Sequence, residues 1–289
     1  MHEAPSRGRR LVADEARFLL TNRIPRRLAT QLFGWFSRIE LSLVRGASLW
    51  MWTHMADLRL HEAKKSRFDS VHDCFIRELR HGCRPIDHCP DVLVSPCDAI
   101  VGAHGTVEGT TVFQAKGFPY ALGDLLCDAE RVERYRNGRY VTLRLTPSMY
   151  HRFHAPADCR VSDVTYISGD TWNVDPVALR RIARLYCRNE RVVIDTQLPG
   201  SSEHLTLVPV AAILVASIRL HFLDALLDTQ YSGKVEIPCS AQFRKGEEMG
   251  WFQHGSTIIV FAPKDVALWG SVHQGAVIRM GEPLMRLPT

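Results

Sequence analysis

Hydrophobic residues follow two different periods along this chain, and the change falls near residue 90. Between residues 24 and 45 they recur at spacings of 3, 4, 7 and 8, which places one apolar stripe along a helix. The stripe consists of Ile24, Leu28, Leu32, Trp35, Phe36, Ile39 and Leu43, and Arg27, Arg38 and Arg45 gather along one edge of it. We predict helices near residues 10–80, 124–135 and 175–187.

From about residue 90 onward, short runs of strand-forming residues recur between Gly, Pro, Asp and Asn. These runs are TVFQAKG (111–117), RYVTLRLTP (139–147), VSDVTYISG (161–169), RVVIDTQ (191–197), LTLVPVAAILVASI (205–218), GKVEIP (233–238), STIIVFAP (256–263) and AVIRMGEPLMRL (276–287). Because strands and helices do not alternate regularly, the pattern favours an antiparallel β core. Two similar turn-and-strand segments, 245–252 and 280–287, favour a barrel-sandwich arrangement. We predict an α+β protein with N-terminal amphipathic helices over 1–70 and a β-rich domain over 71–289.

Charge is concentrated at the N-terminus. Residues 1–50 contain nine arginines and four acidic residues, an excess of +5 that equals the net charge of the whole chain. Such a segment points to an anionic partner, and the apolar stripe, followed by Trp50 and Trp52, favours a lipid surface. The alternative is that the stripe packs on the protein's own core. Aromatic residues interleaved with basic ones, as nucleic-acid binding requires, are not seen.

Composition limits the remaining classes. The chain is 46% hydrophobic and 23% charged, which suits a globular protein with a substantial core. It lacks both a run long enough to span a membrane and the apolar core of a signal peptide, so we expect neither a spanning helix nor secretion. Eight cysteines occur without a CxxC pair, and the spacing of His81, Cys83, His88 and Cys89 matches no standard zinc pattern. We expect free, mostly buried thiols in a reducing compartment and no metal site.

Three polar clusters contain the parts of a nucleophile–base–orienter relay. Ser256 follows Gly255 at the start of the apolar run 257–261, Asp98 follows the apolar run 92–94, and His151 and His154 lie three residues apart. A histidine can take the serine proton while a carboxylate orients the imidazole. The residue types alone leave other interpretations open, because a turn explains Gly255–Ser256 and loop hydrogen bonds explain the histidines.

Several motifs agree in order and spacing with one family. Arg77-Glu78-Leu79-Arg80 with Arg84-Pro85, Ser95-Pro96-Cys97-Asp98, Tyr150-His151-Arg152-Phe153-His154-Ala155-Pro156, and the segment from Gly246 to Met249 with Gly255-Ser256-Thr257 resemble those of the phosphatidylserine decarboxylases. The similarity runs from about residue 45 to the C-terminus. The total length of the chain also fits the membrane-associated bacterial type.

The resemblance implies a self-processing, pyruvoyl-dependent carboxy-lyase. The chain would cut itself between Gly255 and Ser256 into a β chain (1–255) and an α chain (256–289), and Ser256 would become the pyruvoyl cofactor. His154, oriented by Asp98, would supply the base for cleavage. The pyruvoyl group would form a Schiff base with phosphatidylserine, and His151 would donate the proton that completes decarboxylation to phosphatidylethanolamine, with a pKa suited to that step. The partners implied are phosphatidylserine, an anionic membrane surface and the chain's own two fragments; a further dimer of these is left open. We expect a peripheral protein on the cytoplasmic face of the cell membrane.

This chain departs from the family pattern in three places. Ala99 replaces the glycine that usually follows the aspartate, Cys159 ends the histidine motif, and His254 precedes the Gly-Ser-Thr. Arg77, Arg80 and Arg84 suit a helix-face salt bridge as well as a headgroup contact. Two further hypotheses stay open: a serine hydrolase that uses the same residues without cleavage, and a non-catalytic lipid-binding protein. The first lacks a GxSxG elbow before a helix.

Overall fold

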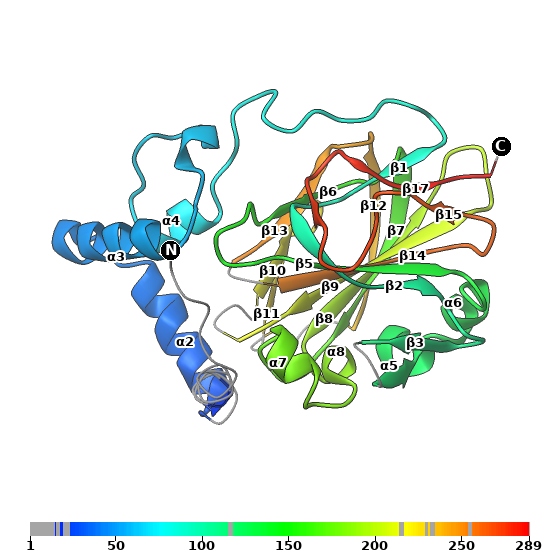
Figure 1. The fold of residues 1–289 in the computed structure, drawn as a ribbon, viewed down its shortest axis with the longest axis horizontal. Coiled ribbons are helices and arrows are strands. Elements are labelled where there is room, and N and C mark those ends of the chain that lie inside the picture. The colour runs from blue at the N-terminus through cyan, green and yellow to red at the C-terminus, as the bar shows by residue number, and fades with distance from the viewer. Residues whose placement is uncertain are drawn as a thin grey trace, which may run out of the picture.

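The computed structural model describes residues 15, 18–19, 24–114, 118–213, 217–228, 231, 235–253 and 256–288. A body of antiparallel sheets forms most of the molecule, and the N-terminal helices project from one side of it (Figure 1). The α+β class predicted from the sequence is therefore confirmed. The predicted division at residues 70 and 71 stays a prediction, and one small apolar cluster (Leu58, Ala63, Phe68 and Cys74) includes residues from both sides of it.

An eight-stranded antiparallel sheet forms the centre of the body. Its strands, in spatial order, are β12 (Glu236–Phe243), β7 (Cys159–Ile167), β8 (Arg191–Gln197), β9 (His204–Ala211), β14 (Ser256–Ala262), β5 (Arg139–Arg144), β2 (Ala99–Thr106) and β16 (Val277–Ile278). The two edge strands, β12 and β16, do not pair with each other in the described part of the chain, so the sheet stays open. The predicted hairpins thus belong to a sandwich without a closed barrel.

Three smaller sheets complete the body. One contains β11 (Leu226–Asp228), β10 (Ser217–Leu220), β13 (Glu248–Phe252) and β6 (Arg152–His154), the second contains β1 (Val92–Val94), β17 (Pro283–Arg286) and β15 (Ala267–Leu268), and the third pairs β3 (Thr111–Phe113) with β4 (Pro119–Ala121). Each predicted β run contributes at least one of these strands. The long apolar run over 205–218 contributes two, because it spans most of β9 and the start of β10.

Strand β14 is buried on both faces. Ile258 and Val260 face the sandwich core, whereas Ile259 and Phe261 pack in a second core with the short helices of the body. Side chains alternate between the two faces of a strand, so a strand between two cores must be apolar at every position. This explains why TIIVF shows no polar alternation. The helices are α5 (Leu122–Leu126), α6 (Ala129–Arg134), α7 (Pro176–Leu179) and α8 (Leu185–Arg188).

Between residues 24 and 91, all of which the structure describes, the N-terminal segment contains two longer helices and two short ones. They are α2 (Arg26–Ser37), α3 (Ser42–Met55), the 3₁₀ helix η1 (Leu60–Glu62) and α4 (Val71–Phe75). The single helix expected over 24–45 is therefore divided between residues 38 and 41. Ser37 donates its hydroxyl to the Gly34 carbonyl at 3.0 Å, a local bond that competes with helix continuation.

Helix α2 is tied to the body near both ends. Arg26 forms an ion pair with Asp170, with Nη2 2.5 Å from Oδ2, and its guanidinium lies 3.6 Å from the ring centroid of Trp172. Arg38, just beyond the helix, donates to the Gln253 side chain at 2.8 Å. The arginine-rich edge predicted for this helix thus contacts the protein itself at Arg38, and the side chain of Arg27 lies outside the described residues.

The apolar stripe of these helices is largely uncovered. Leu28, Leu32, Trp35 and Leu43 are exposed, and α3 contributes exposed Trp50, Met51 and Met55. The alternative in which the stripe packs on the protein's own core therefore does not hold for these residues. In the part of the chain that the structure describes, no helix combines the length and the apolar character needed to cross a membrane.

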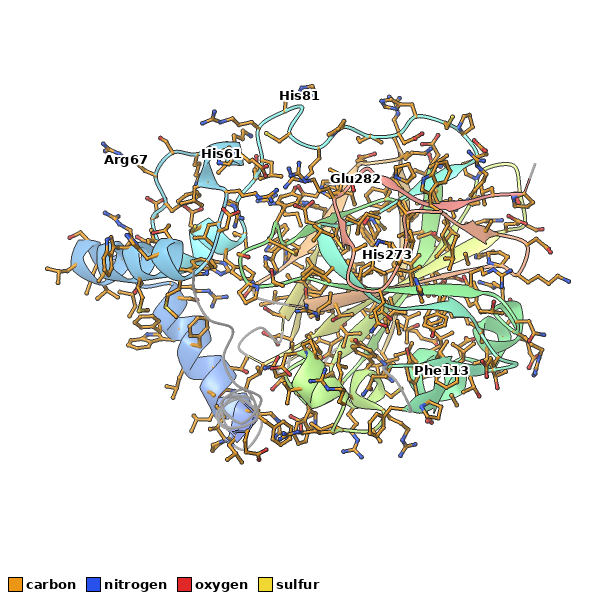
Figure 2. The ribbon with its side chains drawn as sticks, in the orientation of Figure 1. His61, Arg67, His81, Phe113, His273 and Glu282 are labelled. Carbon is orange, nitrogen blue, oxygen red and sulfur yellow. The ribbon has the colours of Figure 1, made fainter. Side chains whose placement is uncertain are left out.

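A long connection, residues 76–91, leads from the helices to β1 along the outside of the body (Figure 1). Figure 2 shows His81 on its outer side, directed away from the sheets. All eight cysteines carry free thiols; three are buried, three are half-buried, and Cys89 and Cys127 are exposed.

Both predicted turn segments close on this connection. A Cβ on Gly246 would lie 2.2 Å from Ile86 Cδ1, and a Cβ on Gly281 would lie 2.4 Å from the Pro85 carbonyl oxygen. Both glycines also have positive φ, +80° and +89°. The repeated glycine therefore reflects two turns that pack against one short stretch of chain.

Candidate active site

Ser256 is the first residue of β14 and is fully buried. It pairs with Ala211 of β9, and its carbonyl accepts a hydrogen bond from the Leu145 amide at 2.9 Å. Its hydroxyl oxygen has no hydrogen-bond partner in the described part of the protein. A buried hydroxyl without a partner costs free energy, so its retention calls for a role other than stability. Gly255 and His254 lie outside the described residues.

A cavity of about 800 Å³ adjoins Ser256. On the body side, Ser256, Leu145 and Ala212 line it; on the other side lie Trp52 of α3 and Phe75 of α4, among other residues of the N-terminal helices. Most of its lining is apolar. The cavity is large enough for part of a lipid-like molecule, and it joins the exposed helices to the buried serine.

His151 is completely buried beside this cavity. The ring of Phe75, which lines the cavity, lies 3.9 Å from the imidazole centroid. Nδ1 lies 2.8 Å from the Met149 carbonyl oxygen, and because a carbonyl only accepts, Nδ1 carries the proton of this bond. Nε2 has no partner in the described part of the chain. The neutral imidazole thus presents an unprotonated Nε2.

Burial is the main reason why the pKa of His151 falls to about 3, and the charge of Arg77 lowers it further. At neutral pH this imidazole is therefore a proton acceptor in the full-length chain. The sequence-based expectation was of a proton donor with a suitable pKa. The structure corrects the starting state: His151 must first gain a proton at Nε2 before it can donate one.

His154, in β6, is held at both ring nitrogens. Nδ1 donates to the Gly246 carbonyl at 2.9 Å, which leaves Nε2 to accept a hydrogen bond from the Tyr150 hydroxyl at 3.0 Å. The imidazole is buried, and burial is the main reason why its pKa is lowered. The Tyr150 hydroxyl occupies the nitrogen that a general base would use. Sequence reasoning quoted Tyr150 with the histidine motif but gave it no role.

Asp98 pairs with Arg84. Arg84 Nε lies 2.8 Å from Oδ1 and Nη2 lies 2.5 Å from Oδ2, and the Met280 amide also donates to Oδ1 at 3.0 Å. Arg84 contacts Glu62 as well; although burial opposes it, bonding to the two carboxylates raises the pKa of the guanidinium. The two-pronged contact fills both carboxylate oxygens.

The predicted Ser256–His154–Asp98 relay is therefore not assembled in the described residues of this full-length chain. Asp98 still acts on His154 at a distance, since its charge favours the protonated imidazole. The structure instead places Ser256 in the cavity wall and His151 against Phe75, which also lines that cavity, while Asp98, Arg84, Tyr150 and His154 form a separate polar group. The assignment of roles to these residues stays a prediction.

The departures from the family pattern have simple structural settings. Ala99 begins β2, pairs with Ile278 of β16 and is not among the described residues with positive φ. A glycine is therefore not needed there. Cys159 begins β7 and packs in the sandwich core, where burial raises its pKa to about 12. A thiol in that state is inert.

Sequence reasoning missed the apolar wall supplied by the N-terminal helices. Phe75 lies two residues before Arg77 in the sequence, and nothing in its spacing showed that it lies against His151. Trp52 stacks on Phe75, with ring centroids 5.8 Å apart. Trp52, Phe75 and His151 meet through tertiary packing, and the hydrophobic periodicity of the sequence carries no information about such contacts.

Comparisons with known proteins agree with one another. The sequence model of the phosphatidylserine decarboxylase family matches residues 71–286. A phosphatidylserine decarboxylase proenzyme of Saccharophagus degradans is 30% identical over 286 residues, covering 96% of this chain and 99% of the relative. That of Shewanella amazonensis is 33% identical, with 95% and 99% covered, and that of Haemophilus influenzae is 32% identical, with 90% and 92% covered. The fold places a buried serine beside an apolar cavity, and the matching relatives are decarboxylases. Together these findings define the class of the protein as a carboxy-lyase. The chain belongs to the phosphatidylserine decarboxylase family.

Proposed function

We propose that this chain converts phosphatidylserine to phosphatidylethanolamine and CO2, using a pyruvoyl group that it makes from Ser256 by cutting itself between Gly255 and Ser256. The relatives named as proenzymes support both the substrate and the processing. The observation that carries the proposal is the position of the Ser256 hydroxyl, which is buried, without a partner and at the wall of the apolar cavity.

The surroundings of Ser256 fit a pyruvoyl group. A new N-terminus at Ser256 would be held by the ladders that β14 forms with β5 and β9. The remaining strands of the 34-residue fragment, β15 to β17, pair with β2, β1 or each other. The two fragments would therefore stay together as one heterodimer after cleavage. The cavity provides a largely apolar space for a reactive carbonyl.

Cleavage begins at the serine hydroxyl. The Ser256 oxygen attacks the carbonyl carbon of Gly255, and the peptide amide becomes an ester while the nitrogen of Ser256 becomes an amine. Elimination then releases the Gly255 carboxylate and leaves a dehydroalanine, which takes up water and loses ammonia to give the pyruvoyl group. A neutral serine needs a base for the first step. We assign it to His154, which requires that Tyr150 release Nε2.

When present, the pyruvoyl group supplies the electron sink that decarboxylation requires. His151 then serves as the proton carrier. Its unprotonated Nε2 can accept a proton from the substrate ammonium and return it to the carbon that loses CO2. The product amine then takes up one proton from water, which balances the proton consumed when hydrogen replaces CO2, and His151 returns to its neutral state.

The exposed helices α2 and α3 suit the source of the substrate. Their uncovered Trp and Leu side chains would insert into the interface of an anionic leaflet, with arginines at the headgroup level. The substrate's acyl chains would then enter the cavity between these helices and the body. We place the protein as a peripheral enzyme on the cytoplasmic face of the cell membrane, working as a heterodimer of its own two fragments.

Denaturing electrophoresis with intact-mass measurement tests the proposal. Active protein should show two chains, of about 29 and about 4 kDa. These masses follow from dividing the 32.7 kDa of the 289-residue chain between fragments of 255 and 34 residues. The Ser256→Ala protein should remain one chain without activity, because the alanine has no oxygen to attack. Activity from an uncut wild-type chain would overturn the pyruvoyl mechanism and favour a hydrolase-like use of the serine. An uncut, inactive wild type that still binds vesicles would indicate a lipid-binding protein.

Two histidine variants separate the assigned roles. The His154→Ala chain should stay uncut, whereas the His151→Ala chain should cut itself and fail to decarboxylate. An uncut His151→Ala chain would transfer the role of the cleavage base to His151, whose Nε2 is already unprotonated.

A further inference from the structure

Arg77 is a buried arginine whose described hydrogen bonds all go to backbone carbonyls. Only 5% of the residue is exposed. Nη1 donates to Cys74 at 3.2 Å, and Nη2 donates to Leu58 and to Ser148, both at 2.9 Å. The guanidinium thus ties the end of α4 and the segment before η1 to the loop that leads into the histidine motif. Neither the helix-face salt bridge nor the headgroup contact considered for this residue describes its setting.

The same guanidinium reaches the carbonyl that orients His151. Arg77 Nη2 lies 3.4 Å from the Met149 oxygen, and His151 Nδ1 lies 2.8 Å from that oxygen. Both groups approach one acceptor. Because Arg77 also binds the neighbouring Ser148 carbonyl, it fixes the peptide units that hold the imidazole.

Arg77 also provides the charge that His151 senses. Its positive charge lowers the pKa of the imidazole beyond the effect of burial. The ring of Phe75, on the other side, is apolar, and Arg152, which follows His151 in sequence, is paired with Glu248 at 2.8 Å. Burial lowers the pKa of Arg77, but an arginine stays protonated in proteins. A permanent positive charge therefore opposes protonation of His151.

We propose that Arg77 is a positioning residue that holds His151 in the neutral tautomer with Nδ1 protonated and Nε2 open to accept the substrate's proton. The assignment rests on the role proposed above for His151. Arg77 acts in two ways: its hydrogen bonds fix the Met149 carbonyl, and its charge keeps the ring unprotonated until the substrate arrives. The residue need not touch the substrate.

The decisive measurement follows the His151 imidazole by ¹⁵N NMR in full-length protein that carries Ser256→Ala. This background needs no pyruvoyl group, so the result is independent of whether the cleavage proposal holds. Signals are assigned by comparison with a His151→Asn protein. The parent should show an Nδ1-protonated ring that stays neutral to below pH 4, consistent with a pKa of about 3.

Two substitutions at Arg77 separate charge from hydrogen bonding. Arg77→Gln removes the charge and should raise the titration midpoint of His151 by on the order of one unit. Arg77→Lys keeps the charge and loses the forked donors, so it should leave the midpoint low while the Nε2-protonated tautomer gains population. A folded Arg77→Gln protein with an unchanged midpoint and tautomer would overturn the proposal. If that variant does not fold, an unchanged tautomer in Arg77→Lys would overturn it instead.

Arg80 provides the matched control. It lies three residues further along the same connection and donates to the Ala63 carbonyl at 3.0 Å, but its side chain is exposed. Arg80→Gln should leave the His151 signals unchanged, and an equal shift in this variant would show a general loss of packing. In cleaved enzyme, Arg77→Gln should lower kcat about tenfold or more with little change in KM, since it disturbs orientation and not binding.

Discussion

At the scale of single residues, Ser256 and Asp98 lie in opposite settings in the described part of the protein: the Ser256 hydroxyl is buried without a hydrogen-bond partner, whereas both carboxylate oxygens of Asp98 are bonded. Ser256 could be singled out because a glycine and a hydroxyl open an otherwise apolar run, and its buried, unpartnered oxygen agrees with a reactive role. The expected contact of Asp98 with His154 was not found, because Arg84, 14 residues earlier, fills both carboxylate oxygens. Hydrogen-bond partners depend on which loops meet in space. A sequence motif specifies residue types, but it does not specify which loops come into contact.

The buried histidines should make the stability of the folded protein depend on pH. The pKa of His151 is about 3 when folded, chiefly because of burial, against about 6.5 in an unfolded chain. Between these values the unfolded state binds the extra proton, so stability falls as pH drops from about 6.5 toward 3. His72, with a pKa near 4 through burial, adds to the same trend. Each such histidine contributes a slope of about 1.4 kcal/mol per pH unit inside its window.

Urea unfolding of uncut Ser256→Ala protein at several pH values from 4.5 to 7.5 measures this slope. A further His151→Asn substitution keeps a donor for the Met149 carbonyl but cannot be protonated, so the slope should decrease by about 1.4 kcal/mol per unit. His61, which is exposed and lies on the helical segment (Figure 2), is the matched control. His61→Asn should leave the slope unchanged. An unchanged slope in His151→Asn would mean that the imidazole is not held neutral.

At the scale of elements, strand prediction succeeded because the runs are long and apolar where two cores enclose them, as in β14. The helices were less well bounded. The break between α2 and α3 left no proline or glycine signal in residues 38–41, and tertiary contacts such as Arg38 with Gln253 fix it. The pairing order of the strands could not be predicted either. Strand β14 lies between β9 and β5, and these two neighbours are far from it and from each other along the chain. Nothing in the local pattern encodes that placement.

The two glycine turns give a prediction about elements. Gly246→Ala and Gly281→Ala should each destabilise the protein, since a left-handed conformation costs an alanine about 1 kcal/mol before any clash. The two losses of stability should respond differently to a second substitution. The added methyl at 246 meets the end of the Ile86 side chain, whereas the one at 281 meets the backbone oxygen of Pro85.

Free energies of unfolding for a double-mutant cycle check this difference. Adding Ile86→Ala should recover part of the Gly246→Ala loss, with a coupling of about 1 kcal/mol, and should recover none of the Gly281→Ala loss. Equal recovery at both positions would show that the turns relax by moving the whole connection. No recovery at 246 would show that backbone strain alone sets the cost there.

At the scale of the whole molecule, the sequence predicted that the N-terminal helices would meet a lipid surface but not how they would meet the body. Helix α2 is attached through Arg26 and Arg38, so its apolar side remains free. The same helical segment closes the cavity at Ser256. One set of helices can therefore both face a bilayer and shape the entrance to the reactive group. The charge excess of residues 1–50 indicated only the first of these roles.

Vesicle binding tests the surface of these helices directly. Leu43 is 85% exposed and Trp50 is 65% exposed, and neither is needed to pack the body. Burying such a side chain in a bilayer interface contributes roughly 1.5–3 kcal/mol, so Leu43→Ser with Trp50→Ser should weaken binding to anionic vesicles at least tenfold. Val277, on β16 of the body, is also 65% exposed, and Val277→Ser should bind as the parent does.

Decarboxylation of a short-chain phosphatidylserine in detergent should survive in the parent, the double variant and Val277→Ser, because the cavity residues are untouched. Undiminished vesicle binding by the double variant would place the membrane contact elsewhere on the molecule, and a loss of detergent activity would show that these side chains hold the cavity closed.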